Sequence, residues 1–230
     1  MSQQQVTVGI VLSRIDYGEA DRIITFITPD VGKIRLIAKG VRRIKSKLAG
    51  GIELFSTSNL TYVWGRGDIG TLVSARLVTH YGNIVRNVDR TMLGYELIKE
   101  LHRATEDELE VGYFHLLEQI FVALNDDEIV LKLIRLWFSA QLLKLNGHTP
   151  NLQTDATGAK LDAGKNYEFS FDDCTFVARS DGMFGAPDIK FLRLVFSENQ
   201  PAMLAKIAGI MQRIEHTYQL VAFMQQQYIR

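Results

Sequence analysis

A dense group of basic residues is the part of this sequence best suited to binding a charged ligand. Seven Lys and Arg residues occur within residues 33–47, and no Asp or Glu lies between Asp30 and Glu53. Cations at this density attract a polyanion, because neutralising its phosphates releases condensed counterions. We therefore predict a phosphate-binding surface, and its members are Lys33, Arg35, Lys39, Arg42, Arg43, Lys45 and Lys47.

The first three of these cations are predicted to share one face of a strand. Basic and apolar residues alternate over residues 33–39, and successive side chains of a strand point to opposite faces. Lys33, Arg35 and Lys39 should therefore form an exterior row that continues into a basic loop. A solvated loop is the ordinary explanation of a short charge run, but an ordered row favours a binding surface. No base-reading motif accompanies it, so we expect contacts to the nucleic-acid backbone with little sequence preference.

The sequence shows no pattern of a catalytic centre. None of its five histidines lies at metal-ligand spacing from another His or a Cys, and it contains neither a Gly-x-Ser-x-Gly motif nor a P-loop. Asp172 and Asp173 could suggest a nuclease, but adjacent carboxylates on a strand point to opposite faces, and on a turn they are usually solvated. We predict that the protein is not an enzyme, with no catalytic residue and no cofactor.

The elements that must position the basic residues are predicted to be five short strands. Period-two alternation or β-branched and aromatic enrichment marks residues 6–12, 23–27, 33–39, 60–64 and 72–78. Five strands within about 80 residues indicate a small closed barrel. The connection over residues 40–55 is too long for a hairpin turn. An OB-fold barrel commonly has such a connection in this place, often helical. Tyr62 and Trp64 are expected to pack in the barrel or against its neighbour rather than to stack on bases.

Beyond residue 81 the period changes to that of helices. Asp89 is the predicted N-cap of the first helix, and an apolar helix over residues 130–145 should form the buried centre of a helical domain. Residues 167–171 and 175–178 predict a small hairpin, and a final long helix should begin near Pro201. The predicted fold is α+β with two domains: an OB-fold barrel over residues 1–80 and a helical domain over 81–230. An irregular hairpin insert occupies about 150–187.

The charge distribution and the cysteine content indicate the expected ligand and the expected cellular compartment. The chain of 230 residues has no net charge, yet residues 1–80 carry +5, residues 81–150 carry −4 and residues 151–230 carry −1. Such asymmetry favours a nucleic-acid face on the first part. The single cysteine, Cys174, fits a reducing cytoplasm. No uncharged run approaches the length of a membrane span, so no membrane partner is expected.

Several motifs together resemble the bacterial RecO family of DNA repair and recombination mediators. They are Asp-Tyr-Gly-Glu-Ala-Asp-Arg-Ile at residues 16–23, Thr-Pro-Asp-Val-Gly-Lys at 28–33, Ala-Lys-Gly-Val-Arg-Arg at 38–43 and Lys-Ser-Lys-Leu-Ala-Gly at 45–50. Gly-His-Thr-Pro-Asn-Leu at 147–152 is similar to the end of the family's central helices. The resemblance is specific in the first 80 residues and weaker beyond.

The resemblance implies an OB-fold barrel followed by a helical domain, in a cytoplasmic, nucleoid-associated protein. It implies binding of single- and double-stranded DNA by the seven basic residues, and strand annealing without ATP. It also implies partnership with RecR and displacement of single-strand-binding protein, so that RecA can load. An RNA-binding OB-fold protein and a protein-interaction module without annealing activity are the alternatives.

One departure from the family concerns zinc. Many members carry two Cys-x-x-Cys pairs after the central helices, but residues 154–158 contain no cysteine and the second region offers only Cys174. A structural zinc site needs four ligands, and His148 with Cys174 cannot supply them. We predict no metal and an inert, apolar Cys174. The hairpin should instead be held by aromatic side chains, namely Tyr167, Phe169, Phe171 and Phe176.

Overall fold

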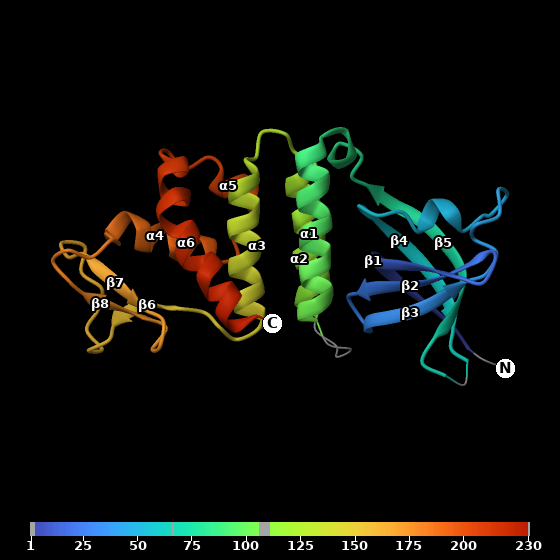
Figure 1. Ribbon diagram of the computed structural model, residues 1–230, viewed down its shortest axis with the longest axis horizontal. Coiled ribbons are helices and arrows are strands. Elements are labelled where there is room, and N and C mark those ends of the chain that lie inside the picture. Colours follow the sequence, from blue (N-terminus) through green and yellow to red (C-terminus); the bar gives the residue numbers. More distant parts are fainter. Residues whose placement is uncertain (1–2, 66, 106–110, 230) are drawn as a thin grey trace. The chain divides into compact units, whose positions relative to one another are not determined.

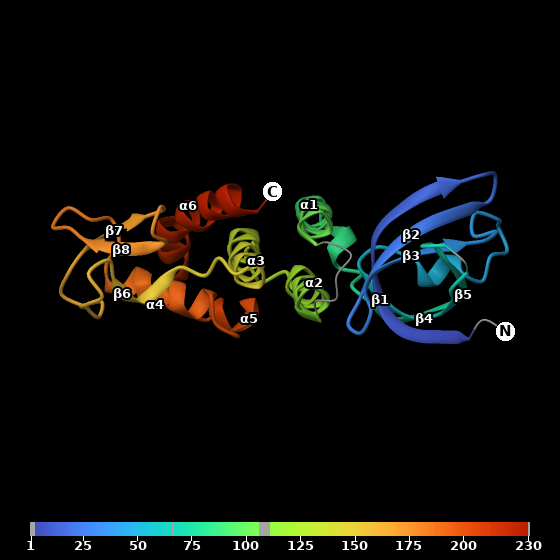
Figure 2. The ribbon, with the colours of Figure 1, turned by 90° about the horizontal axis from the view of Figure 1, so that it is seen from below.

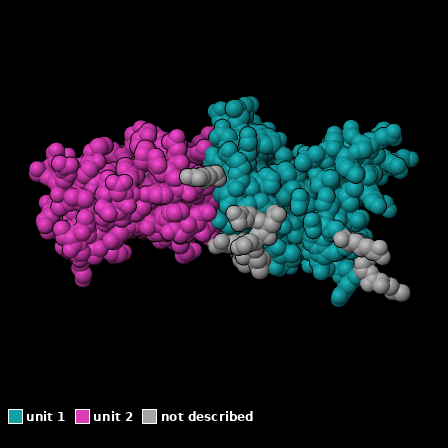
Figure 3. All heavy atoms as spheres, turned by 60° about the horizontal axis from the view of Figure 1, so that its bottom comes forward, with its two compact units in different colours: residues 1–127 teal, residues 128–230 magenta. Residues whose placement is uncertain are grey.

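The chain forms two compact units, residues 1–127 and residues 128–230 (Figure 3). The computed structural model describes residues 3–65, 67–105 and 111–229. The predicted boundary between residues 80 and 81 coincides with the end of the last barrel strand, where strands give way to helices inside the first unit.

The first unit is built on a closed five-stranded barrel, seen along its opening in Figure 2. Its strands are β1 (Gln4–Tyr17), β2 (Asp21–Thr28), β3 (Gly32–Ala38), β4 (Ser56–Val63) and β5 (Gly70–His80). They neighbour one another in the order β1-β2-β3-β5-β4, and β4 pairs with β1 to close the ring. This arrangement confirms the predicted OB-like barrel. β1, β2 and β5 extend beyond their predicted bounds at both ends, whereas β3 ends at Ala38 and β4 at Val63, one residue before their predicted ends.

The pairing around the barrel is uneven. β1, β2 and β3 form a continuous antiparallel meander, and β4 pairs with both β1 and β5 along most of its length. β3 and β5 meet in parallel through only two residue pairs, Leu36 with Gly70 and Ile37 with Thr71. Gly70 suits this seam because a Cβ there would lie 2.8 Å from the Leu36 side chain.

Alternate residues of the strands fill the barrel. Ile34, Leu36 and Ala38 of β3 are buried in its core, as their alternation predicts. Tyr62 is 1% exposed, and its ring meets the half-buried Trp64 edge-on at 5.7 Å. Both aromatic side chains thus pack within the barrel, as expected. The Trp64 indole Nε1 also donates to Gln5 Oε1 at 3.0 Å.

Two helices complete the first unit: α1 (Val88–Ala104) and α2 (Val111–Leu124). Phe55 joins them to the barrel, with ring centroids 5.3 Å from Tyr95 and 5.5 Å from Phe121. The predicted N-cap at Asp89 is wrong by two residues. Asn87 caps α1, because its side chain accepts the Arg90 backbone N–H and Asp89 lies inside the first turn.

The second unit combines helices with a small sheet (Figure 1). Its helices are α3 (Leu131–Leu145), α4 (Ala186–Val195), α5 (Pro201–Leu204) and α6 (Ile210–Tyr228), and its strands are β6 (Asn151–Asp155), β7 (Tyr167–Ser170) and β8 (Thr175–Ala178). α3 is buried nearly all round and packs against α6 and α4, as expected. β7 and β8 form the predicted hairpin, whereas β6, parallel to β8, was not predicted.

The single long helix predicted from Pro201 is wrong. α5 ends at Leu204, and α6 begins at Ile210 after Gly209, whose φ of +70° breaks a right-handed helix. Met211, in the first turn of α6, is 53% exposed. In the described ranges no helix has both the length and the apolar character needed to cross a membrane.

Candidate nucleic-acid interface

Hydrogen bonds attach the basic segment, residues 33–47, to the barrel where β3 ends. Gly40 turns the chain with a φ of +65°, and its backbone N–H donates to Asp21 Oδ1 at 2.7 Å. The backbone N–H of Arg42 donates to the Ala20 carbonyl at 2.9 Å, while Val41 is buried in the barrel core. These contacts fix the start of the basic loop against the β1–β2 hairpin.

A second set of contacts holds the far end of the loop. Leu48 packs against the barrel core, and its backbone N–H donates to Ser46 Oγ at 3.3 Å. The short 3-10 helix η1 (Ala49–Gly51) follows, and it is the one helical turn of the connection. Residues 42–47 therefore lie between two anchors, the buried Val41 and the partly buried Leu48.

Six of the seven predicted residues have exposed side chains. We call them the cationic surface, and they are Arg35, Lys39, Arg42, Arg43, Lys45 and Lys47. Arg35 lies on the outer face of β3 opposite Thr25 of β2, and the other five follow on the chain that leaves this strand. Apart from Arg42, none of the six has an ion-pair partner among the residues that the structure describes. Their charges are available to an external anion.

Lys33 differs from the other six. Its ammonium donates to the carbonyls of His102 at 3.2 Å and Thr105 at 2.5 Å, at the carboxyl end of α1. A cation is favourable there because the last carbonyls of a helix lack partners within the helix and carry partial negative charge. The structure thus places Lys33 on the helix rather than in the exposed row, and we expect it to add little to DNA binding.

Exchanging Lys33 for methionine is expected to lower the free energy of unfolding by about 2 kcal/mol, the typical worth of hydrogen bonds from a charged donor. The salt dependence of DNA binding should stay unchanged. Arg35→Met is the matched control, because Arg35 is exposed on the same strand face. It should change the salt dependence and leave stability nearly constant. Urea denaturation and fluorescence anisotropy measure the two quantities, and the reverse pattern would show that Lys33 contacts DNA.

Asp16 provides one counter-charge inside the cationic surface. Its Oδ1 accepts a hydrogen bond from Arg22 Nε at 2.8 Å, and its Oδ2 lies 3.6 Å from Arg42 Nε. The Arg22 hydrogen bond, aided by the charge of Arg42, holds the pKa of Asp16 below its ordinary value. The carboxylate is therefore ionised at neutral pH. Asp16 is in a different strand from the basic segment, and its role was not predicted.

Asp16→Asn is expected to tighten DNA binding by about two- to threefold at neutral pH, because a nearby negative charge that competes for Arg42 is lost. Glu19→Gln is the control, since it removes the same charge from the same hairpin but has no recorded contact with Arg42. Anisotropy titrations at one salt concentration compare the two. Equal gains in DNA affinity for the two variants would mean that affinity depends only on the total charge of the protein.

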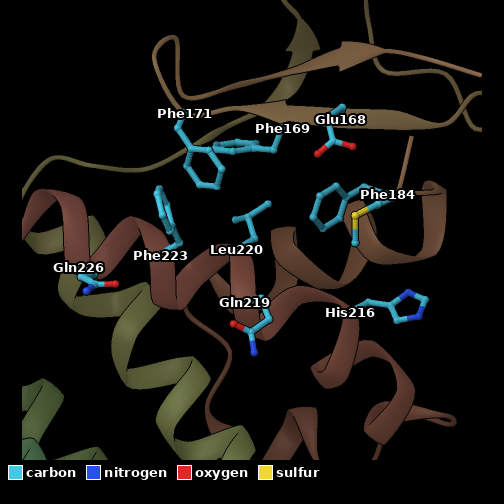
Figure 4. A pocket seen from close by; sticks show the side chains of 10 residues that line it. Glu168, Phe169, Phe171, Phe184, His216, Gln219, Leu220, Phe223 and Gln226 are labelled. Carbon is cyan, nitrogen blue, oxygen red and sulfur yellow. The ribbon is translucent and has the colours of Figure 1, made fainter. Parts of the chain in front are cut away.

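An apolar groove is the second surface feature, and it lies within the second unit. Phe169 and Phe171 of the β7 hairpin face Leu220 and Phe223 of α6 across a hollow of about 320 Å³ (Figure 4). The rings of Phe171 and Phe223 are 4.4 Å apart. His216, at one end, is the sole imidazole of this lining. The lining is mainly apolar and suits an apolar contact, but it also includes the Glu168 carboxylate, and His216 Nδ1 lies 3.5 Å from Asp188 Oδ1.

Within the described ranges, no three His, Cys, Asp or Glu side chains are grouped to hold a metal. Asp155 instead fixes the turn after β6, where its Oδ1 accepts from the backbone N–H groups of Thr157 and Ala159 at 2.9 and 3.2 Å. These bonds, with that from the Thr157 hydroxyl, lower the pKa of Asp155. Edge-on ring contacts among Tyr167, Phe169 and Phe176 hold the hairpin.

Cys174 makes a polar contact that was not predicted. It turns the chain with a φ of +48° between β7 and β8, and its Sγ lies 3.1 Å from the Tyr228 hydroxyl. That hydroxyl donates to the Phe171 carbonyl at 2.6 Å. The contact with Cys174 raises the pKa of Tyr228 to about 12. The thiol thus ties the hairpin turn to the end of α6 instead of filling an apolar gap.

Comparisons with known proteins agree with the first-unit geometry. The family model "Recombination protein O N terminal" matches residues 1–81. The DNA repair protein RecO of Dehalococcoides mccartyi is 31% identical over 163 residues, which are 70% of this chain and 64% of that protein. The proteins of the same name from Trichodesmium erythraeum and Rubrobacter xylanophilus are both 32% identical, over 64% and 63% of this chain and 50% and 58% of theirs. The chain therefore spans less than two thirds of the length of these relatives.

Proposed function

The chain belongs to the RecO family of DNA repair and recombination proteins, and from this we propose that it is a non-catalytic mediator that holds DNA by its phosphate backbone. The cationic surface is the observation that carries the proposal. It presents exposed cations, most of them without an ion-pair partner in the described part of the chain, beside an OB-like barrel. Such a surface binds the backbone of any sequence.

The loop supports binding of both single- and double-stranded DNA. Residues 42–47 lie between their two anchors, so their side chains can follow phosphates at different spacings. Tyr62 is buried and Trp64 is half-buried, which leaves backbone contacts rather than base stacking as the main source of affinity. Two strands held without base readout can then test their complementarity directly, which is the requirement for annealing.

The cellular role follows as a further part of the proposal. We expect the protein to anneal complementary strands without ATP in the cytoplasm, near the nucleoid. With RecR it should act on DNA coated by single-strand-binding protein and so help RecA to load. No cofactor or metal takes part in this role. The RecO proteins named above support it, and because the chain spans only part of their length, each of these steps needs its own test.

The decisive experiment is annealing of two complementary oligonucleotides, each coated with the cognate single-strand-binding protein, in the absence of ATP. The protein should raise the annealing rate well above that of the coated strands alone. A matched reaction with non-complementary strands provides the control for aggregation. DNA binding without any acceleration would contradict the mediator role. Equal or tighter binding of RNA, or capture of the coating protein without DNA binding, would favour the alternative functions.

A further inference from the structure

A polar hollow lies at the open end of the β7–β8 hairpin, within the second unit. It is an open depression of about 370 Å³, and its lining residues are all exposed: Gly164, Lys165, Asn166, Ala178, Arg179 and Ser180. The hairpin register creates it. Tyr167 pairs with Ala178, and the Arg179 backbone N–H donates to the Asn166 carbonyl at 3.0 Å. The residues just before β7 and just after β8 are thus held beside each other.

Both walls of the hollow are fixed by hydrogen bonds. On one side, the hydroxyl of the buried Tyr167 accepts the Asp162 backbone N–H at 2.7 Å, and Asp162 Oδ1 accepts the Gly164 N–H at 2.8 Å. On the other side, the Gly182 N–H donates to the Arg179 carbonyl at 3.2 Å. A Cβ on Gly182 would lie 2.4 Å from the Tyr167 backbone, so this turn packs directly on β7. A ligand would meet walls that are already ordered.

The charge of the hollow is positive. Lys165, just before β7, and Arg179, just after β8, both line it. Arg179 has a partner in Asp181, with Nε 3.8 Å from Oδ1, but both side chains are largely exposed and the pair is weak. In the described part of the chain, Lys165 has no carboxylate at ion-pair distance, although its charge helps to lower the pKa of the nearby Asp155. The Asn166 amide and the Ser180 hydroxyl have no hydrogen-bond partner recorded there.

We infer that this hollow binds a phosphodiester group of a second DNA strand. The oxygens of a phosphate accept hydrogen bonds, and this hollow offers four kinds of donor: an ammonium, a guanidinium, an amide and a hydroxyl group. The inference rests on the proposed function, because annealing needs two strands held at once. The cationic surface belongs to the first unit and the hollow to the second, so the two sets of cations share no residue.

The test measures capture of a second strand by the full chain. A biotinylated oligo-dT is immobilised and bound by the protein, and a fluorescent oligo-dT is then added, so that no base pairing can occur. The double variant Lys165→Gln with Arg179→Gln should bind the immobilised strand as well as the wild type does. It should capture the second strand about tenfold less, and its log–log salt slope for that step should fall by about 1.4, or ~0.7 for each lost phosphate contact.

The control variant is Lys190→Gln with Lys206→Gln. It makes the same charge change at two exposed positions of the second unit outside the hollow, and it should capture the second strand normally. Wild-type capture by the Lys165 and Arg179 variant, or equal losses in both variants, would overturn the inference. Failure of the wild type to bind the first strand would instead contradict the proposed function.

Free phosphate could occupy the same hollow, and amide chemical shifts distinguish the two sources. The backbone amides of Asn166 and Ser180 should respond to oligo-dT at lower phosphate concentration than to inorganic phosphate. An equal or stronger response to inorganic phosphate would show a site for the free ion and would overturn the assignment to a strand.

Discussion

Replacing Arg42, Arg43, Lys45 and Lys47 together with glutamine is expected to weaken binding of single-stranded DNA about 100-fold near physiological salt. Each lost phosphate contact should also flatten the log–log salt slope by about 0.7 for a single strand and about 0.9 for a duplex. The effect should be equal for all base sequences, because the lost contacts are to phosphates. Anisotropy titrations at several salt concentrations measure both the affinity and the slope.

The structure explains why this change should act on binding and not on folding. All four side chains are exposed, and the loop is anchored by Val41 and Leu48, which the variant keeps. Among the described residues, Arg42 alone of the four has an ion-pair partner, Asp16 at 3.6 Å. Such an exposed pair contributes little to stability.

A control with the same change of charge is available in the first unit. Arg76, Arg86, Lys99 and Arg103 are also exposed, and their joint replacement with glutamine lowers the net charge equally. This control should cost much less affinity if the cationic surface makes the contacts. An unchanged slope in the first variant would show that DNA lies elsewhere, and equal losses in both would indicate attraction by total charge alone.

Gly51→Ala is expected to lower the free energy of unfolding by about 3 kcal/mol, the upper range for overpacking at a well-packed site. A Cβ on Gly51 would lie 2.4 Å from the Ala75 carbonyl oxygen and 2.5 Å from its carbon. These atoms are backbone of β5, which is held by its pairing with β4. The strand cannot move aside without loss of that pairing. Urea denaturation followed by circular dichroism measures the change.

Gly50 is the control because it adjoins Gly51 in η1 and a Cβ there would meet nothing within 4 Å. Gly50→Ala should leave stability within about 0.5 kcal/mol of the wild type. Similar values for the two variants would show that η1 shifts freely away from β5. In that case η1 would not hold the end of the basic loop, and the second anchor would rest on Leu48 alone.

The barrel could be predicted from the sequence because its signal is local. Alternation along β3 places Ile34 and Leu36 inside and Arg35 outside, and the pleat of a strand enforces that alternation. β6 escaped prediction because its pairing with β8 depends on residues about twenty positions away. The break before α6 was missed because Ile207 and Met211 keep a helical spacing across Gly209.

The candidate site was predicted in composition but not in its connections. Charge density along the chain identified the basic residues, yet it could not show that Lys33 reaches the carbonyls of α1, about seventy residues later. Nor could it show that Asp16 approaches Arg42. Both contacts join residues distant in sequence, and they depend on how the barrel closes and where the helix ends.

The short parallel seam between β3 and β5 has a consequence for local opening of the first unit. Two residue pairs join these strands, whereas antiparallel pairs run along the whole of β3 on its other side. Backbone amides at this seam should exchange with solvent through small fluctuations that leave the meander of β1, β2 and β3 intact. Arg35 would then stay on an ordered strand, with Lys39 in the turn that follows it, while the barrel wall opens beside them. Local opening of the seam therefore need not change the positions of these two cations.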